Sequence, residues 1–187
     1  MDRFSALRMA IDLIQIPTRV RHGREAELPH GMEDLLRVAA GQDDVIQDAA
    51  AATGRDAEFL KEAAIFFVEQ ILLAPETDSY RTLGGDRHTS TEELRRNLAL
   101  LMRCLHPDAT HDQSRSVFAG RITSAWEDLK TPERRAIYDA QPSITLNNGK
   151  EAIRKRRHRR RGHVRPSSRQ RPAGLRDILH RIMGRTY

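Results

Sequence analysis

Apolar residues recur at helical spacing through the first part of the chain. In residues 3–16 the apolar positions lie three or four apart, and Pro17 ends the pattern. A short amphipathic segment follows at 31–40, and two more helices are predicted at 43–52 and 56–73. The segment 56–73 is apolar on most sides, which predicts that it is buried on most sides. We therefore expect an N-terminal helical bundle built around it.

Capping residues predict a second series of helices from residue 77 onward. Thr77 or Asp78 caps a short helix. Ser90, with a glutamate three residues later, forms a capping box that begins a long helix, and Pro107 prevents that helix from continuing. After a polar stretch and another helical pattern, Thr131–Pro132 supplies an N-cap and a proline at the first helical position. The expected order is short helix, long helix, polar loop, long helix, short helix.

Composition agrees with these helices, because aromatic residues make up only 5% of the chain and few segments are rich in β-branched residues. The predicted fold class is all-α. Charge, in contrast, is unevenly distributed. Residues 150–171 hold eleven Lys or Arg and one acid, a net charge of +10, whereas residues 1–149 carry −6 within a total of +6. A mildly acidic body is therefore followed by a strongly basic tail.

The tail changes the predicted organisation of the chain. Residues 141–171 lose apolar periodicity and have the composition of a disordered basic linker. Helical spacing returns at 172–187, which predicts a short amphipathic C-terminal helix. The single cysteine, Cys104, suits a reducing compartment, and no signal peptide or spanning segment is evident. We expect a cytoplasmic protein.

The order of the helices, with His106-Pro107-Asp108 at the end of the second, resembles the J-domain of DnaJ-like co-chaperones. Residues 78–84 resemble the D-x-Y-x-x-L-G opening of that family. The segments 125–129 and 133–139 are similar to its A-aromatic-x-x-L and K-R-x-x-Y-D patterns. Four leucines match the buried face of its second helix: Leu94, Leu98, Leu101 and Leu105. The resemblance covers residues 76–140 and predicts a helical hairpin, which follows the N-terminal helical region at 1–75.

The resemblance implies a co-chaperone that binds a seventy-kilodalton heat-shock chaperone and stimulates its ATP hydrolysis. In the family, the His-Pro-Asp turn and the basic face of the second helix engage the ATPase and linker region of the larger chaperone. It therefore implies partner-binding roles for His106, Pro107 and Asp108. On the second helix the basic face would consist of Arg95, Arg96 and Arg103. A proline-stiffened turn would also hold the Asp108 carboxylate where a partner arginine could bind it.

This basic face is poorer in charge than is usual for the family. Ala99, Leu100 and Cys104 stand where some of the basic side chains would be expected. Because electrostatic attraction chiefly sets encounter rate and orientation, fewer charges predict slower or weaker docking. Two interpretations of Leu100 are open: it packs against residues 1–75, or it belongs to a specialised partner surface.

Catalysis by this chain is not expected. Gly84-Gly85 is not followed by Lys-Ser/Thr, so it is no phosphate-binding loop, and no nucleophile stands in a recognisable setting. His106, Asp108, His111 and Asp112 lie close together, but no further His/Cys cluster accompanies them. We predict neither a metal nor another cofactor.

The basic tail supports an alternative function. Its dense cationic run could bind RNA, the ribosome, DNA or anionic lipid by counterion release. In that alternative, the chain is an adaptor that acts through the tail, and its J-like domain is weak or inactive as an ATPase activator. The opposing interpretation is a solvated tail that tunes solubility. The residues predicted to bind polyanions are Arg154, Lys155, Arg156, Arg157, Arg159, Arg160 and Arg161.

Overall fold

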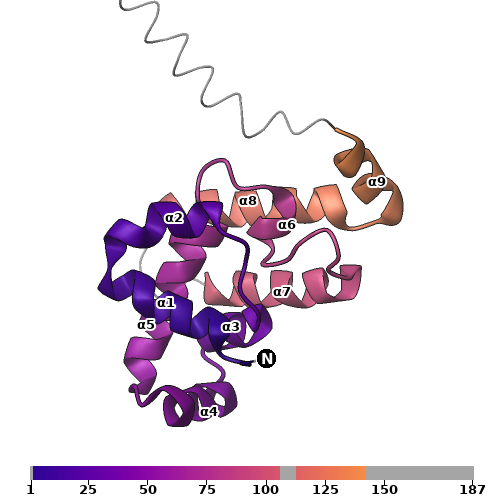
Figure 1. Ribbon diagram of the computed structural model, residues 1–187. Helices are drawn as coiled ribbons and strands as arrows, with labels where there is room; N and C mark the ends of the chain where they lie inside the picture. Colours follow the sequence, from indigo (N-terminus) through magenta and orange to yellow (C-terminus); the bar gives the residue numbers. More distant parts are fainter. Residues whose placement is uncertain (1, 106–112, 142–187) are drawn as a thin grey trace, which may run out of the picture. The chain divides into compact units, whose positions relative to one another are not determined.

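The computed structural model describes residues 2–105 and 113–141, and every regular element in these ranges is helical (Figure 1). The predicted all-α fold class is therefore confirmed for the described part of the chain. The linker predicted at 141–171 lies outside the described residues except for residue 141. The helix predicted at 172–187 lies outside them entirely. Among the described helices, none is long and apolar enough to cross a membrane.

Helix α5 is the centre of the N-terminal region and packs against α1, α3 and α4. Its face of Leu60, Ala63, Ala64 and Phe67 is fully buried, in agreement with the predicted central position of this segment. Asp56 caps the helix by accepting a hydrogen bond from the backbone N–H of Phe59. The α-helices of the region are α1 (Ser5–Gln15), α2 (Val20–Glu25), α3 (Met32–Ala39), α4 (Asp43–Thr53) and α5 (Ala57–Phe67).

Two parts of this region differ from the pattern predicted by the sequence. Pro17 ends α1 as expected, but it also begins a 3₁₀ turn, Pro17–Arg19, that leads into the unpredicted helix α2. Gly23 is buried on α2, and a Cβ there would lie 3.2 Å from Cδ1 of Ile71. The missing side chain therefore allows α2 to approach its neighbours closely. The helix predicted through residue 73 is α-helical only to Phe67. A single π-helical turn, Val68–Leu72, follows it directly.

The second series of helices has the predicted order and the predicted caps. Asp78 accepts a hydrogen bond from the backbone N–H of Arg81 at 2.9 Å, so the cap is Asp78 and not Thr77. Ser90 and Glu93 form the complete capping box. The helices are α6 (Ser79–Thr82), α7 (Thr91–Cys104), α8 (Gln113–Leu129) and α9 (Pro132–Ala140).

Helices α7 and α8 lie side by side and run in opposite directions (Figure 1). Leu94 and Leu101 on α7 are fully buried, as are Ile122 and Leu129 on α8. Helix α6 packs against α8, where Tyr80 is also buried. The predicted helical hairpin is therefore present, with α6 beside it and α9 following α8.

The regions predicted at 1–75 and 76–140 contribute to one buried core. Helix α3 packs directly against α7. The turn after α6 lies between them: a Cβ at Gly84 would be 3.4 Å from Leu36 of α3 and 3.6 Å from Nδ2 of Asn97 on α7. Gly84 has a φ of +67°, a conformation that favours glycine. The contact between α3 and α7 bears directly on the predicted partner-binding surface, because that surface is on α7.

Candidate partner-binding surface

The predicted site residues divide between the described and the undescribed part of the chain. Arg95, Arg96 and Arg103 lie on α7, and all three side chains are exposed. The turn His106-Pro107-Asp108 follows α7 in sequence but lies outside the described residues. Arg103 is three residues before this motif in the sequence.

The inner side of α7 is wider than the leucine pattern predicted. Besides Leu94 and Leu101, the side chain of Asn97 is buried, with 5% of its surface exposed. Its Nδ2 donates hydrogen bonds to the carbonyl oxygens of Leu83 at 3.0 Å and Gly84 at 3.4 Å. Asn97 therefore satisfies backbone oxygens at the end of α6 and ties that turn to α7. The sequence did not predict this role, because Asn97 is a polar residue that breaks no pattern beside the leucines of α7.

Leu100 and Cys104 lie on the same side of α7 as Asn97, because positions three, four and seven apart share a helix face. Both are half-buried and pack against the common core. Leu100 is therefore partly covered by the common core, although part of its side chain stays accessible. Both positions, where basic side chains are typical of the family, therefore carry apolar side chains that pack against the core.

Arg96 borders this buried side and is paired with an acid from the N-terminal region. Its Nε lies 3.9 Å from Oε1 of Glu33 on α3, and both side chains are 53% exposed. Arg96 also lowers the pKa of Glu93, although the main cause there is the hydrogen bond donated by the backbone N–H of Ser90. Arg96 thus forms an ion pair with Glu33 and interacts electrostatically with Glu93, and both carboxylates reduce the positive charge on this edge of α7.

The outer face of α7 is formed by residues four apart. Arg95, Ala99 and Arg103 follow one another along it, and Met102 lies beside them with 40% of its surface exposed. Within the described part of the chain, no ion pair involves Arg95 or Arg103. The cations available for a partner are therefore fewer than the three that the sequence suggests.

A family model, the DnaJ domain, matches residues 78–139, which contain this surface and the His106-Pro107-Asp108 turn. Residues 78–139 form a DnaJ domain. The match covers helices α6 to α9 and excludes the helices that precede them.

Curated relatives match over about a third of the chain. The chaperone protein DnaJ of Rippkaea orientalis is 40% identical over 62 residues, which are 33% of this chain and 16% of that protein. The DnaJ of Thermoplasma volcanium is 35% identical over 75 residues, 38% of this chain and 20% of the relative. The DnaJ of Shouchella clausii is 32% identical over 72 residues, which are 38% of this chain and 19% of that protein. The matched segment spans a fifth or less of these relatives, and no solved structure matches the chain.

The last helix of the DnaJ domain is fixed by tyrosine hydroxyls. Oη of Tyr80 lies 2.9 Å from Nε of Arg135, which donates to it, and donates in turn to the carboxylate of Asp139 at 3.0 Å. Oη of Tyr138 accepts a hydrogen bond from the backbone N–H of Ser79 at 2.9 Å. Burial, followed by the hydrogen bond to Asp139, raises the pKa of Tyr80. The paired motifs at 78–84 and 133–139 are therefore in contact and dock α9 on α6.

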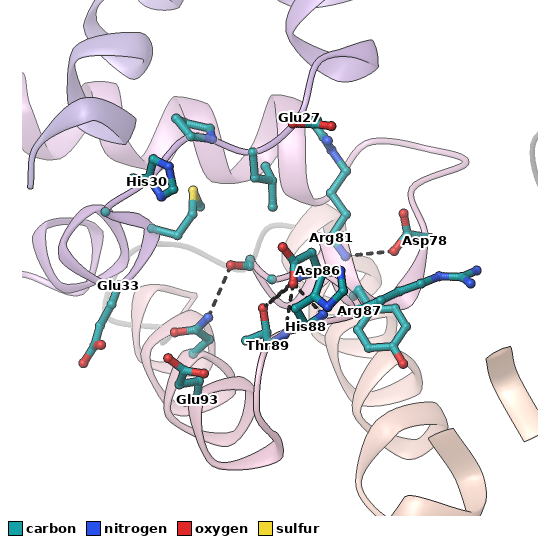
Figure 2. A pocket seen from close by; sticks show the side chains of 18 of the residues that line it. Glu27, His30, Glu33, Asp78, Arg81, Asp86, Arg87, His88, Thr89 and Glu93 are labelled. Carbon is teal, nitrogen blue, oxygen red and sulfur yellow. Dashed lines mark hydrogen bonds between the residues drawn. The ribbon is translucent and has the colours of Figure 1, made fainter. Parts of the chain in front are cut away.

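A groove of about 1260 Å³ lies between the segment 27–34, the turn after α6 and the beginning of α7 (Figure 2). Seven of its lining residues are acidic, and three of these carboxylates accept hydrogen bonds from backbone N–H groups. Asp78 and Glu93 cap helices, and Asp86 accepts hydrogen bonds from the N–H groups of His88 and Thr89. These bonds lower the pKa of Asp86, the one from His88 most. The groove is therefore a structural junction between the N-terminal region and the DnaJ domain.

The residues predicted to bind polyanions, and the His/Asp group for which no metal is predicted, lie outside the described residues. Among the residues that the structure describes, no group of three His, Cys, Asp or Glu side chains could hold a metal ion. His106, Asp108, His111 and Asp112 are outside these residues, as are the seven basic residues between Arg154 and Arg161. The family match ends at residue 139 and does not extend to the basic tail.

Proposed function

We propose that this protein is a co-chaperone that binds a seventy-kilodalton heat-shock chaperone through its DnaJ domain and stimulates ATP hydrolysis by that chaperone. The observation that carries the proposal is the sequence His106-Pro107-Asp108 directly after α7, within the segment that matches the DnaJ family model. The relatives that share this segment are named chaperone protein DnaJ.

The proposed mechanism has two parts. Arg95 and Arg103 are exposed on α7 and attract and orient an acidic surface of the larger chaperone. Asp108 then accepts charge-assisted hydrogen bonds from a partner arginine, an interaction that favours the hydrolysing state of the ATPase. The role of this chain is allosteric and requires no reacting group of its own, so we assign it no catalysis.

Single-turnover ATP hydrolysis by the cognate large chaperone tests the proposal. Wild-type protein should accelerate hydrolysis, and Asp108→Asn should abolish most of the acceleration because the amide replaces the acceptor carboxylate. Asp112→Asn is the matched control, because it removes one negative charge four residues away without changing the His-Pro-Asp motif. If wild-type protein leaves the hydrolysis rate unchanged, the proposal is wrong.

We also propose that the protein acts in the cytoplasm, since its single cysteine, Cys104, suits a reducing compartment.

A second candidate function is favoured by the charge of residues 150–171, which contain eleven Lys and Arg and one acid. This segment would bind polyanions with little sequence preference. Retention of single-stranded RNA or anionic vesicles should decrease with salt and disappear when 150–171 are deleted. Unchanged retention by the deletion variant would contradict it.

A further inference from the structure

Helix α3 contacts the one side of α7 that could otherwise extend the partner-binding surface. Met32 and Leu36 of α3 gather with Asn97 of α7 around Gly84. Leu36 is completely buried, and Asn97 is nearly so. Because such contacts are close-packed, a partner cannot reach this side of α7 without separating the two helices.

Glu33 lies at the outer margin of the same contact. It belongs to the first turn of α3 and approaches Arg96 from a different element, with 3.9 Å between Oε1 and Nε. Figure 2 shows Glu33 and Glu93 on the neighbouring helices α3 and α7. The two acids are therefore close to Arg96, whose charge would otherwise add to that of Arg95 and Arg103.

We propose that α3 is a built-in part of the partner-binding surface and that Glu33 weakens the attraction of this surface for the acidic face of the chaperone. The inference rests on the proposed function and goes beyond it, because it gives the N-terminal region a role in docking. Helix α3 confines the partner to the strip formed by Arg95, Ala99, Met102 and Arg103. Glu33 lowers the positive charge at the edge of that strip.

Replacement of Glu33 tests this role without disturbing the core, because its side chain is 53% exposed. Glu33→Gln should lower the concentration that gives half-maximal ATPase stimulation by about two- to fourfold, the size expected for one surface charge near an interface. Glu33→Lys should lower it further. Maximal stimulation should stay the same, because the residue affects encounter and not the His-Pro-Asp turn. The gain should shrink as salt is raised from about 0.05 to 0.2 M, because added ions screen exposed charges.

Glu58→Gln and Glu58→Lys are the matched controls. Glu58 is also exposed and also lies in the first turn of its helix, α5, so it makes the same change in net charge and loses the same interaction with a helix dipole. The controls should leave the half-maximal concentration unchanged. Circular dichroism melting of all four variants verifies that they are folded.

The outcomes separate the inference from the proposed function. Stimulation by wild type with a lower half-maximal concentration for the Glu33 variants alone supports both. The inference is overturned, and the proposed function stands, if wild type stimulates hydrolysis but the Glu33 variants have an unchanged or higher half-maximal concentration. The same holds if the Glu58 variants show an equal decrease in that concentration. No stimulation by wild type overturns the proposed function, and the inference with it.

Discussion

Arg81 joins the DnaJ domain to the N-terminal region, and its replacement by methionine tests whether that junction stabilises the fold. The side chain begins on α6, and its guanidinium donates hydrogen bonds to the carbonyl oxygens of Ala26 at 2.7 Å and Gly23 at 2.8 Å. Methionine keeps the apolar stem of the side chain and removes both donors. The two carbonyl groups are then left without their partner.

The expected decrease in the free energy of unfolding is the difference between the hydrogen bonds that are lost and the cost of burying the guanidinium. Hydrogen bonds from a charged donor contribute about 1.5–3 kcal/mol each, so the pair contributes about 3–6 kcal/mol before costs. Burial opposes this, because it lowers the pKa of Arg81 and leaves its Nε without a hydrogen-bond partner among the described residues. We therefore expect Arg81→Met to lower the free energy of unfolding by about 2–4 kcal/mol. A chain of this size would melt about 5–15 °C lower.

Urea unfolding followed by circular dichroism at 222 nm measures this loss. Arg21→Met is the control, because Arg21 is 93% exposed and its one ion pair, to Glu25, has an N–O distance of 4.0 Å. It should change the free energy of unfolding by less than about 0.5 kcal/mol. A loss below about 1 kcal/mol in Arg81→Met, or equal losses in the two variants, would refute the reasoning.

Three further substitutions test local features of the DnaJ domain by urea unfolding. Ser90→Ala should cost about 1 kcal/mol, because the capping box of α7 loses its hydroxyl acceptor, and an unchanged midpoint would contradict that role. Tyr138→Phe should cost about 0.5–1.5 kcal/mol through the bond from the Ser79 N–H, whereas a stabilised variant would count against it. The folded pKa of Glu93 lies below its ordinary 4.5, so its carboxylate stabilises the fold above that pH and loses this effect as pH falls through the lower pKa. The stability difference between wild type and Glu93→Gln should therefore narrow from pH 7 to pH 3, and a constant difference would show that the charge is irrelevant.

Local chemistry made several helix boundaries predictable from the sequence. Ser90 and Glu93, three residues apart, each accept a hydrogen bond from the backbone N–H of the other. Thr131 accepts a hydrogen bond from the Arg134 N–H, next to a proline that has no N–H to donate. Such caps depend on neighbours in the chain, so their pattern is sufficient to locate them. The family motifs were predictable for the same reason, because each is a short run with fixed spacing.

Contacts between distant segments could not be predicted in this way. Helix α2 has the sequence VRHGRE, with Val20 as its single apolar side chain, so no apolar period reveals it. Its burial depends on the absence of a side chain at Gly23. The packing of α3 on α7 could not be predicted either, because neither amphipathic pattern shows which distant segment its helix will face. For the same reason the sequence left two interpretations of Leu100 open, and its half-buried position depends on the tertiary packing.

In the proposed mechanism, the DnaJ domain of this chain activates a large ATP-hydrolysing chaperone through Asp108. Single-turnover hydrolysis with wild type, Asp108→Asn and Asp112→Asn measures this most directly. Wild type and Asp112→Asn should accelerate hydrolysis, whereas Asp108→Asn should accelerate it little or not at all. Equal acceleration by all three proteins, or none by any of them, would contradict it.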